Sequence, residues 1–259
     1  MDDQPKFAIH AACREGKVQI VESLLNAHPQ LAKLKDDDGR YPIHWAASAN
    51  SLEIVQLLVN QKGFEVDVQD ESGWTPLMIA ASVKESDAVV DLILSRGADV
   101  NEKNNSGQTV LHFVASKNNI DIARKLFDQQ PPASARVRDK RGQYALHRAA
   151  AVGSVPMVSL LLKNKSPLNA TDAAGYTALH HAVAEGHGEP VTPETQDAQL
   201  VRKKLANSNT LGDTAVALLK AGAETDKKDT DGYLALDLAP DKEVRKYIEQ
   251  AAEREGIEL

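Results

Sequence analysis

Apolar and polar positions in this chain alternate in short helical blocks that recur along its length. Residues 144–169 show the pattern: an Ala-rich block, a break at Gly153-Ser154, a second block that runs to Leu160-Leu161-Leu162, and a polar exit. Neither block is long enough to form a stable helix alone in water. The pattern therefore predicts pairs of short helices, each pair stable only when it is stacked on neighbours that carry the same pattern.

A glycine precedes the first block of nearly every pair and gives the chain its period. It recurs after 34, 34, 35, 33 and 57 residues, at Gly39, Gly73, Gly107, Gly142, Gly175 and Gly232. A period near 33 residues with a motif similar to Thr-Pro-Leu-His is the signature of ankyrin repeats. Two stretches, residues 70–77 (DESGWTPL) and residues 172–180 (DAAGYTALH), resemble that pattern closely.

Each part of the motif has a physical role. The glycine supplies the positive φ of a hairpin turn. Thr75 is expected to cap the following helix, and Pro76 fits its first turn. Paired alanines such as Ala46-Ala47 keep the first helix of each pair slim, so that neighbours stack closely. A histidine after the leucine is expected to tie its ring to backbone amides of an adjacent loop, and it recurs at His10, His44, His112, His147 and His180.

The predicted fold class is all-α: an ankyrin-repeat solenoid of seven repeats, each a helix-turn-helix with a β-hairpin loop, in a single domain over residues 1–259. The interval of 57 exceeds 33 by 24, so residues 189–212 are interpreted as an insertion. A loop of this length is usually functional or disordered, and we expect disorder with one helical turn around Leu200–Leu205. The repeats are expected at approximately residues 5–37, 38–69, 70–103, 104–138, 139–171, 172–228 and 229–259.

Composition and charge narrow the classes of function. The chain has 259 residues, of which 42% are hydrophobic, and a formal net charge of -7. This charge argues against a general affinity for nucleic acid or for anionic membranes. No apolar run approaches the length of a membrane span, and the N-terminal residues lack the layout of a signal peptide. The single cysteine, Cys13, excludes an internal disulfide, and we expect a reducing compartment, the cytoplasm and the nucleus.

The sequence offers little for catalysis or for metal binding. The repeated histidines are assigned to structure, and His181 and His187 have no cysteine or acid cluster to complete a metal site. Residues 36–39 and 229–232 resemble calcium loops only faintly, since they lack the acid at the twelfth position. No phosphate-cradling glycine motif or nucleophile elbow is present. We predict a binding protein that is not an enzyme and uses no cofactor or metal; catalytic groups in the insertion are a remote alternative.

A binding surface is predicted from the repeat positions. In stacked repeats of this kind the turn tips and the first helices line one concave side. Acids gather at these positions in the first repeats and bases gather around the fifth, with both tryptophans among them, as in protein-binding surfaces. Arg141 and Arg148 are expected to face solvent, so that reversing their charge leaves thermal stability nearly constant. The predicted partner-binding residues are Asp37, Asp38, Arg40, Trp45, Glu71, Trp74, Phe113, Lys117, Lys140, Arg141, Arg148, His181 and Glu185.

Several stretches go beyond a generic ankyrin sequence and resemble the gankyrin family. They are Lys35–Trp45, Asp70–Pro76, Ala145–Ala150 with the following Val152-Gly153-Ser154, and Ala184–Gly188. The resemblance implies a monomeric chaperone for assembly of the 19S regulatory-particle base of the 26S proteasome. It also implies that the partner is the C-terminal domain of the third ATPase subunit, with Trp45, Trp74 and Arg148 in the contact. The alternative is another ankyrin-repeat adaptor, such as a kinase-inhibitor-like protein or a cytosolic scaffold.

Overall fold

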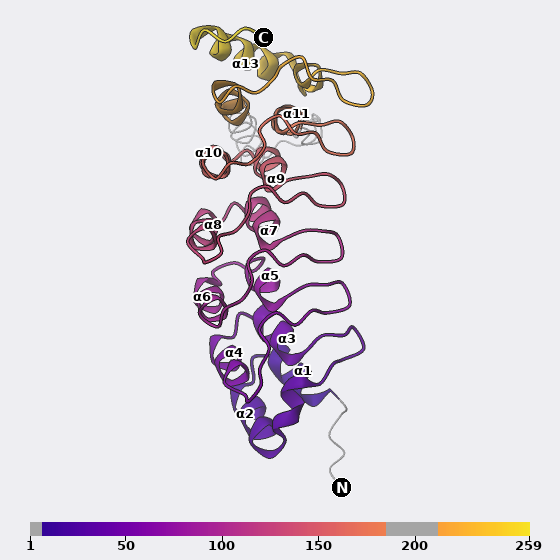
Figure 1. Ribbon diagram of the computed structural model, residues 1–259, viewed down its shortest axis with the longest axis vertical. Coiled ribbons are helices and arrows are strands. Elements are labelled where there is room, and N and C mark those ends of the chain that lie inside the picture. Colours follow the sequence, from indigo (N-terminus) through magenta and orange to yellow (C-terminus); the bar gives the residue numbers. More distant parts are fainter. Residues whose placement is uncertain (1–6, 185–211) are drawn as a thin grey trace, which may run out of the picture. The chain divides into compact units, whose positions relative to one another are not determined.

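The structure is a computed structural model that describes residues 7–184 and 212–259. Short helices follow one another in pairs over these residues (Figure 1). The first three pairs are α1 (Ala8–Arg14) and α2 (Val18–Ala27), α3 (Pro42–Ser48) and α4 (Leu52–Val59), and α5 (Pro76–Ala80) and α6 (Asp87–Ser95). The next two pairs are α7 (Val110–Lys117) and α8 (Ile120–Phe127), and α9 (Ala145–Val152) and α10 (Val155–Lys163).

The last two pairs are less regular. In the sixth, α11 (Ala178–Ala184) is followed, beyond residues 185–211, by a helix over residues 212–220. In the seventh, the short 3-10 helix η2 (Ala235–Leu238) is followed by α13 (Lys242–Arg254), and a second 3-10 helix, η1 (Pro29–Lys33), follows α2. The predicted disorder and helical turn of the insertion lie outside the described residues.

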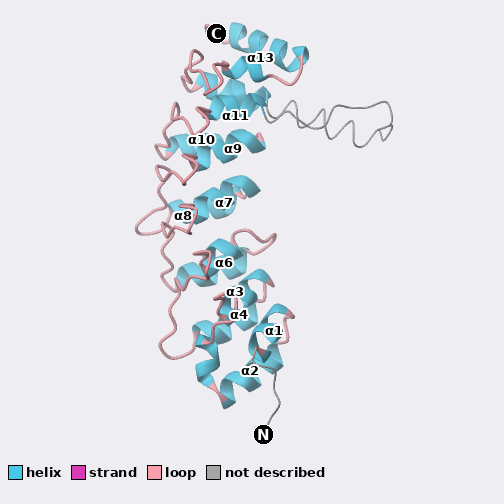
Figure 2. Ribbon diagram, turned by 90° about the vertical axis from the view of Figure 1, so that its right-hand side faces the viewer, coloured by secondary structure: helices cyan, strands magenta, loops and turns pink. Residues whose placement is uncertain are grey.

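The predicted all-α ankyrin fold is confirmed. Helices and loops make up the described residues, where β structure is limited to the isolated bridges Arg138–Tyr144 and Lys228–Leu234 at the bases of two turns (Figure 2). None of the helices in residues 7–184 and 212–259 has the length and apolar character needed to cross a membrane.

The chain divides into two compact units. One comprises Met1–Phe113 with Arg124–Ala133, and the other Val114–Ala123 with Ser134–Leu259. In the first unit α1, α3 and α5 stack in one row and α2, α4 and α6 in a second row. In the second unit α9 stacks on α11, and α11 on η2. The single domain over residues 1–259 stays a prediction.

Small residues allow the first helices of the repeats to approach one another closely. Ala46 and Ala47 of α3, and Ala149 and Ala150 of α9, are fully buried. Larger side chains of the second helices, such as Leu161, fill the space behind them, and each contributes about 1.5–3 kcal/mol when it is removed from water. The predicted role of the paired alanines is confirmed.

Each turn is organised around one Asp or Asn side chain. Its Oδ1 accepts hydrogen bonds from the backbone N–H groups two and four residues further on, at 2.8–3.0 Å. These bonds hold the tip rigidly, because they satisfy backbone donors that would otherwise compete for water. The residues at this position are Asp36, Asp70, Asn104, Asp139, Asp172 and Asp229.

Neighbouring turns touch through their backbones, which explains the repeated glycine. The N–H of Asn105 donates to the carbonyl of Ser72 at 3.0 Å. Gly73 has a φ of +77°, and a Cβ there would lie 2.7 Å from the nitrogen of Asn105. A side chain would therefore meet both an unfavourable backbone conformation and the next turn.

The repeated histidines connect consecutive repeats. Nδ1 of His44 accepts from the backbone N–H of Tyr41 at 3.0 Å, so the proton lies on Nε2, which faces the carbonyls of Val68 and Trp74 at 3.2 and 3.0 Å. The ring was expected to bond backbone N–H groups of the neighbouring loop. That loop instead supplies carbonyl oxygens, and the N–H group comes from Tyr41, three residues before the histidine. In the seventh repeat Asp237 replaces histidine and accepts from the N–H of Leu234 at 3.1 Å.

Candidate protein-binding surface

The second oxygen of the turn aspartate reaches the first helix of the same repeat. Nε1 of Trp45 donates to Oδ2 of Asp36 at 2.7 Å. A guanidinium nitrogen of Arg148 donates to Oδ2 of Asp139 at 3.2 Å in the fifth repeat. In the sixth, Nε2 of His181 lies 2.9 Å from Oδ2 of Asp172. In each case the residue that follows the repeated histidine, nine positions after the aspartate, is fixed by the turn.

Trp45 is the centre of a cation–aromatic cluster in the first unit. The guanidinium carbon of Arg40 lies 4.8 Å from the Trp45 ring centroid, and that of Arg14 lies 5.5 Å from it. Arg40 also pairs with Oδ2 of Asp70 in the next turn at 3.2 Å. Burial raises the pKa of Asp36, but hydrogen bonds from Trp45 and from two backbone N–H groups outweigh it, so the net pKa is lowered. The carboxylate therefore stays charged beside the ring.

A hollow of about 270 Å³ opens beside this cluster. The acids that line the hollow come from the turn of the second repeat, where Asp37 and Asp38 are exposed. Glu71, outside the hollow, is exposed on the tip of the next turn. The hollow thus combines negative charge with an aromatic wall. Its lining residues are Phe7, His10, Ala11, Arg14, Asp36, Asp37, Asp38 and Trp45.

Trp74 and Phe113 form a second aromatic contact. Their ring centroids are 4.3 Å apart with an interplanar angle of 32°. Both side chains are half-buried, and Trp74 follows directly on the glycine of its turn. The pair presents rigid apolar area on the same unit as the exposed acids, a combination that suits an anchor for a protein partner.

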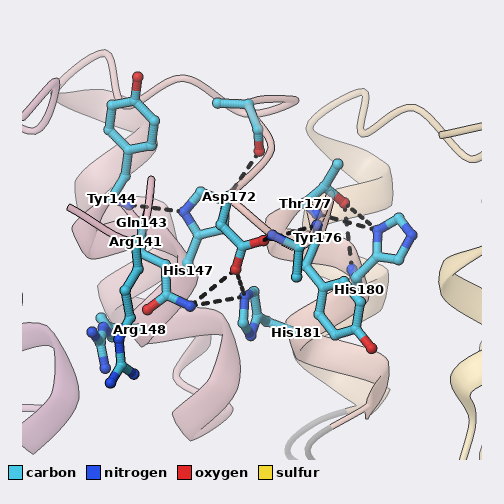
Figure 3. Close-up of polar contacts among 12 residues, drawn as sticks. Arg141, Gln143, Tyr144, His147, Arg148, Asp172, Tyr176, Thr177, His180 and His181 are labelled. Atoms are coloured by element: carbon cyan, nitrogen blue, oxygen red, sulfur yellow. Dashed lines mark hydrogen bonds and ion pairs between the residues drawn. The ribbon is translucent and has the colours of Figure 1, made fainter. Parts of the chain in front are cut away.

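Asp172 joins the fifth and sixth repeats in the second unit (Figure 3). Its Oδ2 accepts from Nε2 of Gln143 at 3.0 Å and lies 2.9 Å from Nε2 of His181. Burial raises the pKa of Asp172, but the bonds from Gln143 and His181 outweigh it and leave the pKa below its usual value. The ring of His147 packs edge-on against that of His181, with centroids 5.5 Å apart. Burial, together with His181, lowers the pKa of His147 to about 4.

The basic residues of the fifth repeat occupy two different environments. Lys140 and Arg141 are exposed on the turn tip. The side chain of Arg148 is only 27% exposed and pairs with Asp139, whose side chain is 2% exposed. The expectation that Arg148 faces solvent is therefore wrong, because the second oxygen of the turn aspartate draws its guanidinium onto the protein.

The remaining predicted residues are placed as follows. Lys117 is exposed at the end of α7. His181 is 9% exposed and is largely used inside the protein. Glu185 lies outside the described residues, as does His187.

The turn aspartates were missed by reasoning from the sequence, although their spacing is visible in it. Asp36, Asp139 and Asp172 each stand three residues before a turn glycine and nine before a polar or aromatic residue. A search for acids at that spacing finds all three. Sequence reasoning assigned them only to turn formation and so overlooked the second oxygen.

The described residues include neither a cluster of possible metal ligands nor an exposed thiol. Residues 7–184 and 212–259 contain no group of three or more His, Cys, Asp or Glu side chains that could hold a metal ion. Cys13 is buried, and burial raises the pKa of its thiol to about 12. Such a thiol remains protonated and is a poor nucleophile.

Rigid turns, stacked helix pairs and a surface of charged tips define an ankyrin-repeat protein. The family model described as ankyrin repeats (three copies) matches residues 9–104, 62–136 and 111–192, and the chain belongs to this family. A solved structure described as the ankyrin repeat domain of Bcl-3, a unique member of the IkappaB protein family, matches with a TM-score of 0.67 and 23% identity. The match covers 95% of this chain and 100% of that one and bears on the fold alone.

Two curated proteins are similar over part of the chain. The probable 26S proteasome regulatory subunit p28 of Saccharomyces cerevisiae is 39% identical over 118 residues, which are 45% of this chain and 41% of the yeast protein. The human BCL-6 corepressor-like protein 1 is 31% identical over 134 residues, 46% of this chain and 7% of that protein. The resemblance to the gankyrin family is confirmed by the yeast match, and none of these matches indicates an enzyme family.

Proposed function

We propose that this protein binds a subunit of the proteasome and acts as a chaperone for assembly of the 19S regulatory-particle base. The proposed partner is the C-terminal domain of the third ATPase subunit, bound by the monomeric protein in the cytoplasm and nucleus. The similarity to the yeast regulatory subunit supports this choice of partner. Because the match covers less than half of either chain, the partner and the assembly role are proposals.

One observation carries the proposal: rigid turns fix charged and aromatic residues of the first helices before any partner arrives. The turn aspartates hold Trp45, Arg148 and His181 in place. A surface ordered in advance loses little conformational entropy on binding. Exposed acids at Asp38 and Glu71, and exposed bases at Lys140 and Arg141, would select a partner of complementary charge and speed the encounter.

The mechanism that follows is steric and electrostatic. A bound ATPase domain has one face covered by this protein, so a competing partner of that face is kept away until the protein leaves. No covalent step is needed. The charges decide which of several related ATPase domains is bound, and the aromatic contacts supply apolar area.

Charge reversal on an exposed tip tests this proposal. Arg141→Glu is expected to raise the Kd for the ATPase C-terminal domain by about tenfold, because a like charge replaces a complementary one. Lys163→Glu at the end of α10 is the matched control, since it makes the same charge change at an exposed position on a second helix. Its Kd should change by less than about twofold. Calorimetric titration of both variants and the wild type at two salt concentrations gives these values.

The outcome also separates the proposed function from the adaptor alternative. If the wild-type protein does not bind the ATPase domain at low salt, and affinity capture returns other proteins instead of proteasome ATPases, the adaptor alternative holds. If both variants weaken binding equally, the interaction depends on net charge and the turn tips have no special part in it.

A further inference from the structure

The turn of the seventh repeat contains a buried carboxylate oxygen that is left without a donor. Asp229 is 7% exposed, and its Oδ1 accepts the backbone N–H groups of Asp231 and Tyr233 at 2.9 Å each, as in every other turn. Its Oδ2 has no hydrogen-bond partner among the described residues. A buried acceptor in this state destabilises the fold, because it has lost its hydrogen bonds to water without gaining another.

Two positions supply the donor in other repeats. One is the residue nine positions later, such as Arg148 for Asp139. The other is the residue after the glycine of the preceding turn: Arg40 donates to Asp70 at 3.2 Å, and Gln143 donates to Asp172 at 3.0 Å.

At Asp229 neither of these positions supplies a donor to Oδ2. Nine positions later stands Leu238, and after the glycine of the preceding turn stands Tyr176. Tyr176 lies close to Asp229, since a Cβ on the adjacent Gly175 would lie 2.9 Å from the Cα of Asp229. Burial and then the charges of Asp229 and Asp231 raise the pKa of the Tyr176 phenol. It still makes no hydrogen bond to the orphaned oxygen.

The chain itself shows which group fits such an oxygen. Arg40 bonds Oδ2 of Asp70 through Nε while its guanidinium lies over the ring of Trp45, 4.8 Å from the centroid. The seventh turn offers the same elements without the arginine: the acceptor of Asp229, the rings of Tyr176 and His181, which pack with centroids 5.5 Å apart, and no basic residue at the donor positions.

We propose that the turn of the seventh repeat binds an arginine side chain of the protein partner, with its guanidinium on Oδ2 of Asp229 and against the ring of Tyr176. The 54% exposed Tyr233 forms the outer rim of this site. The inference rests on the proposed function, because it takes a protein as the partner. It extends the binding surface to the seventh repeat, which contains none of the binding residues predicted from the sequence. Because Oδ2 of Asp229 is buried, the proposal requires the partly buried ring of Tyr176 to shift when the guanidinium binds.

The test uses Asp229→Asn, a change for which the chain provides its own precedent. Asn104 builds the same turn, with its Oδ1 accepting two N–H groups at 2.9 Å. The variant should therefore keep the turn and its thermal stability while losing the charge and the second acceptor. Asp231→Asn, two residues away and exposed, is the control for net charge.

Binding of the ATPase C-terminal domain is the first measurement. Asp229→Asn should raise its Kd by about tenfold, whereas Asp231→Asn should raise it by less than about twofold. Equal effects of the two variants, or none at Asp229, would overturn the proposal while leaving the proposed function intact.

A second measurement needs no partner protein, and it decides the inference even if the ATPase domain fails to bind. The full chain is titrated with N-acetyl-arginine amide, and with the neutral citrulline analogue, while backbone amide signals are followed by NMR. We expect saturable shifts confined to Asp229–Tyr233 and the Tyr176 turn with the arginine compound only, and their loss in Asp229→Asn. Shifts that are absent, or that persist in that variant, would show that the oxygen is satisfied by water alone.

Discussion

Arg148→Glu is expected to lower the free energy of unfolding by about 2–3 kcal/mol, because it places a carboxylate against a buried one. The side chain of Asp139 is 2% exposed and already uses its other oxygen for two backbone N–H groups. The loss is smaller than for a fully buried pair, since the Arg148 side chain is 27% exposed and solvent screens part of the interaction.

Arg141→Glu is the matched control for this prediction. It makes the same charge change in the same repeat, but Arg141 is exposed on the turn tip, so its effect should stay within about 0.5 kcal/mol. Urea unfolding of both variants, followed by far-ultraviolet circular dichroism, gives the comparison. Equal stability of the two variants would show that the Arg148–Asp139 pair contributes nothing to folding.

The same pair of variants also separates stability from binding. Arg148→Glu is expected to weaken the ATPase complex, but part of that loss comes from a disturbed turn. Arg141→Glu should weaken binding while leaving the fold intact. A role in recognition is therefore better tested at Arg141, and Arg148 is better regarded as a residue that the turn holds in position.

Acidification from pH 7 to pH 5 is expected to remove about 2 kcal/mol of unfolding free energy through His147 alone. Its ring is fully buried, accepts the N–H of Tyr144 at 2.9 Å through Nδ1 and faces the carbonyl of Ala170 at 3.0 Å through Nε2. Protonation at Nδ1 would break the first bond. Burial and the neighbouring His181 lower the pKa of His147 from its ordinary value of 6.5 to about 4.

The direction of the effect follows from proton uptake. Between about pH 6.5 and pH 4 the unfolded chain binds a proton at His147 that the folded chain does not, so stability falls as the pH falls through this window. His44 and His180, whose pKa values are also lowered mainly by burial, act in the same direction. The carboxylates Asp36 and Asp172 have lowered pKa values and lose their contribution only at more acidic pH.

Two measurements check this prediction. The unfolding free energy is determined in urea at half-unit steps of pH, and the imidazole signal of His147 is followed by NMR over the same range. His28→Gln is the control, since it removes an exposed histidine of the same chain. A His147 ring that titrates near 6.5 would contradict the prediction, as would a stability that is flat between pH 7 and pH 5.

Local sequence determined the architecture of this protein. The regular spacing of the turn glycines, the paired alanines and the leucine–histidine motif specify a helix pair and its turn within about 33 residues. Because each repeat meets mainly its neighbours, repeating that unit predicts the stack. The exposed tips Asp38, Lys140 and Arg141 were predictable for the same reason, since they stand one or two residues before a turn glycine, at the tip of the hairpin.

Only the tertiary structure decided what the side chains behind the tips do. Asp36 and Asp139 each divide their oxygens between the backbone and a side chain nine residues away, and Arg40 pairs with Asp70, thirty residues on. The first two contacts lie within one repeat, whereas the contact of Arg40 with Asp70 joins two packed repeats, which no single repeat encodes. Asp229 is the exception, because neither Leu238 nor Tyr176, which stand at the two donor positions, donates to its Oδ2.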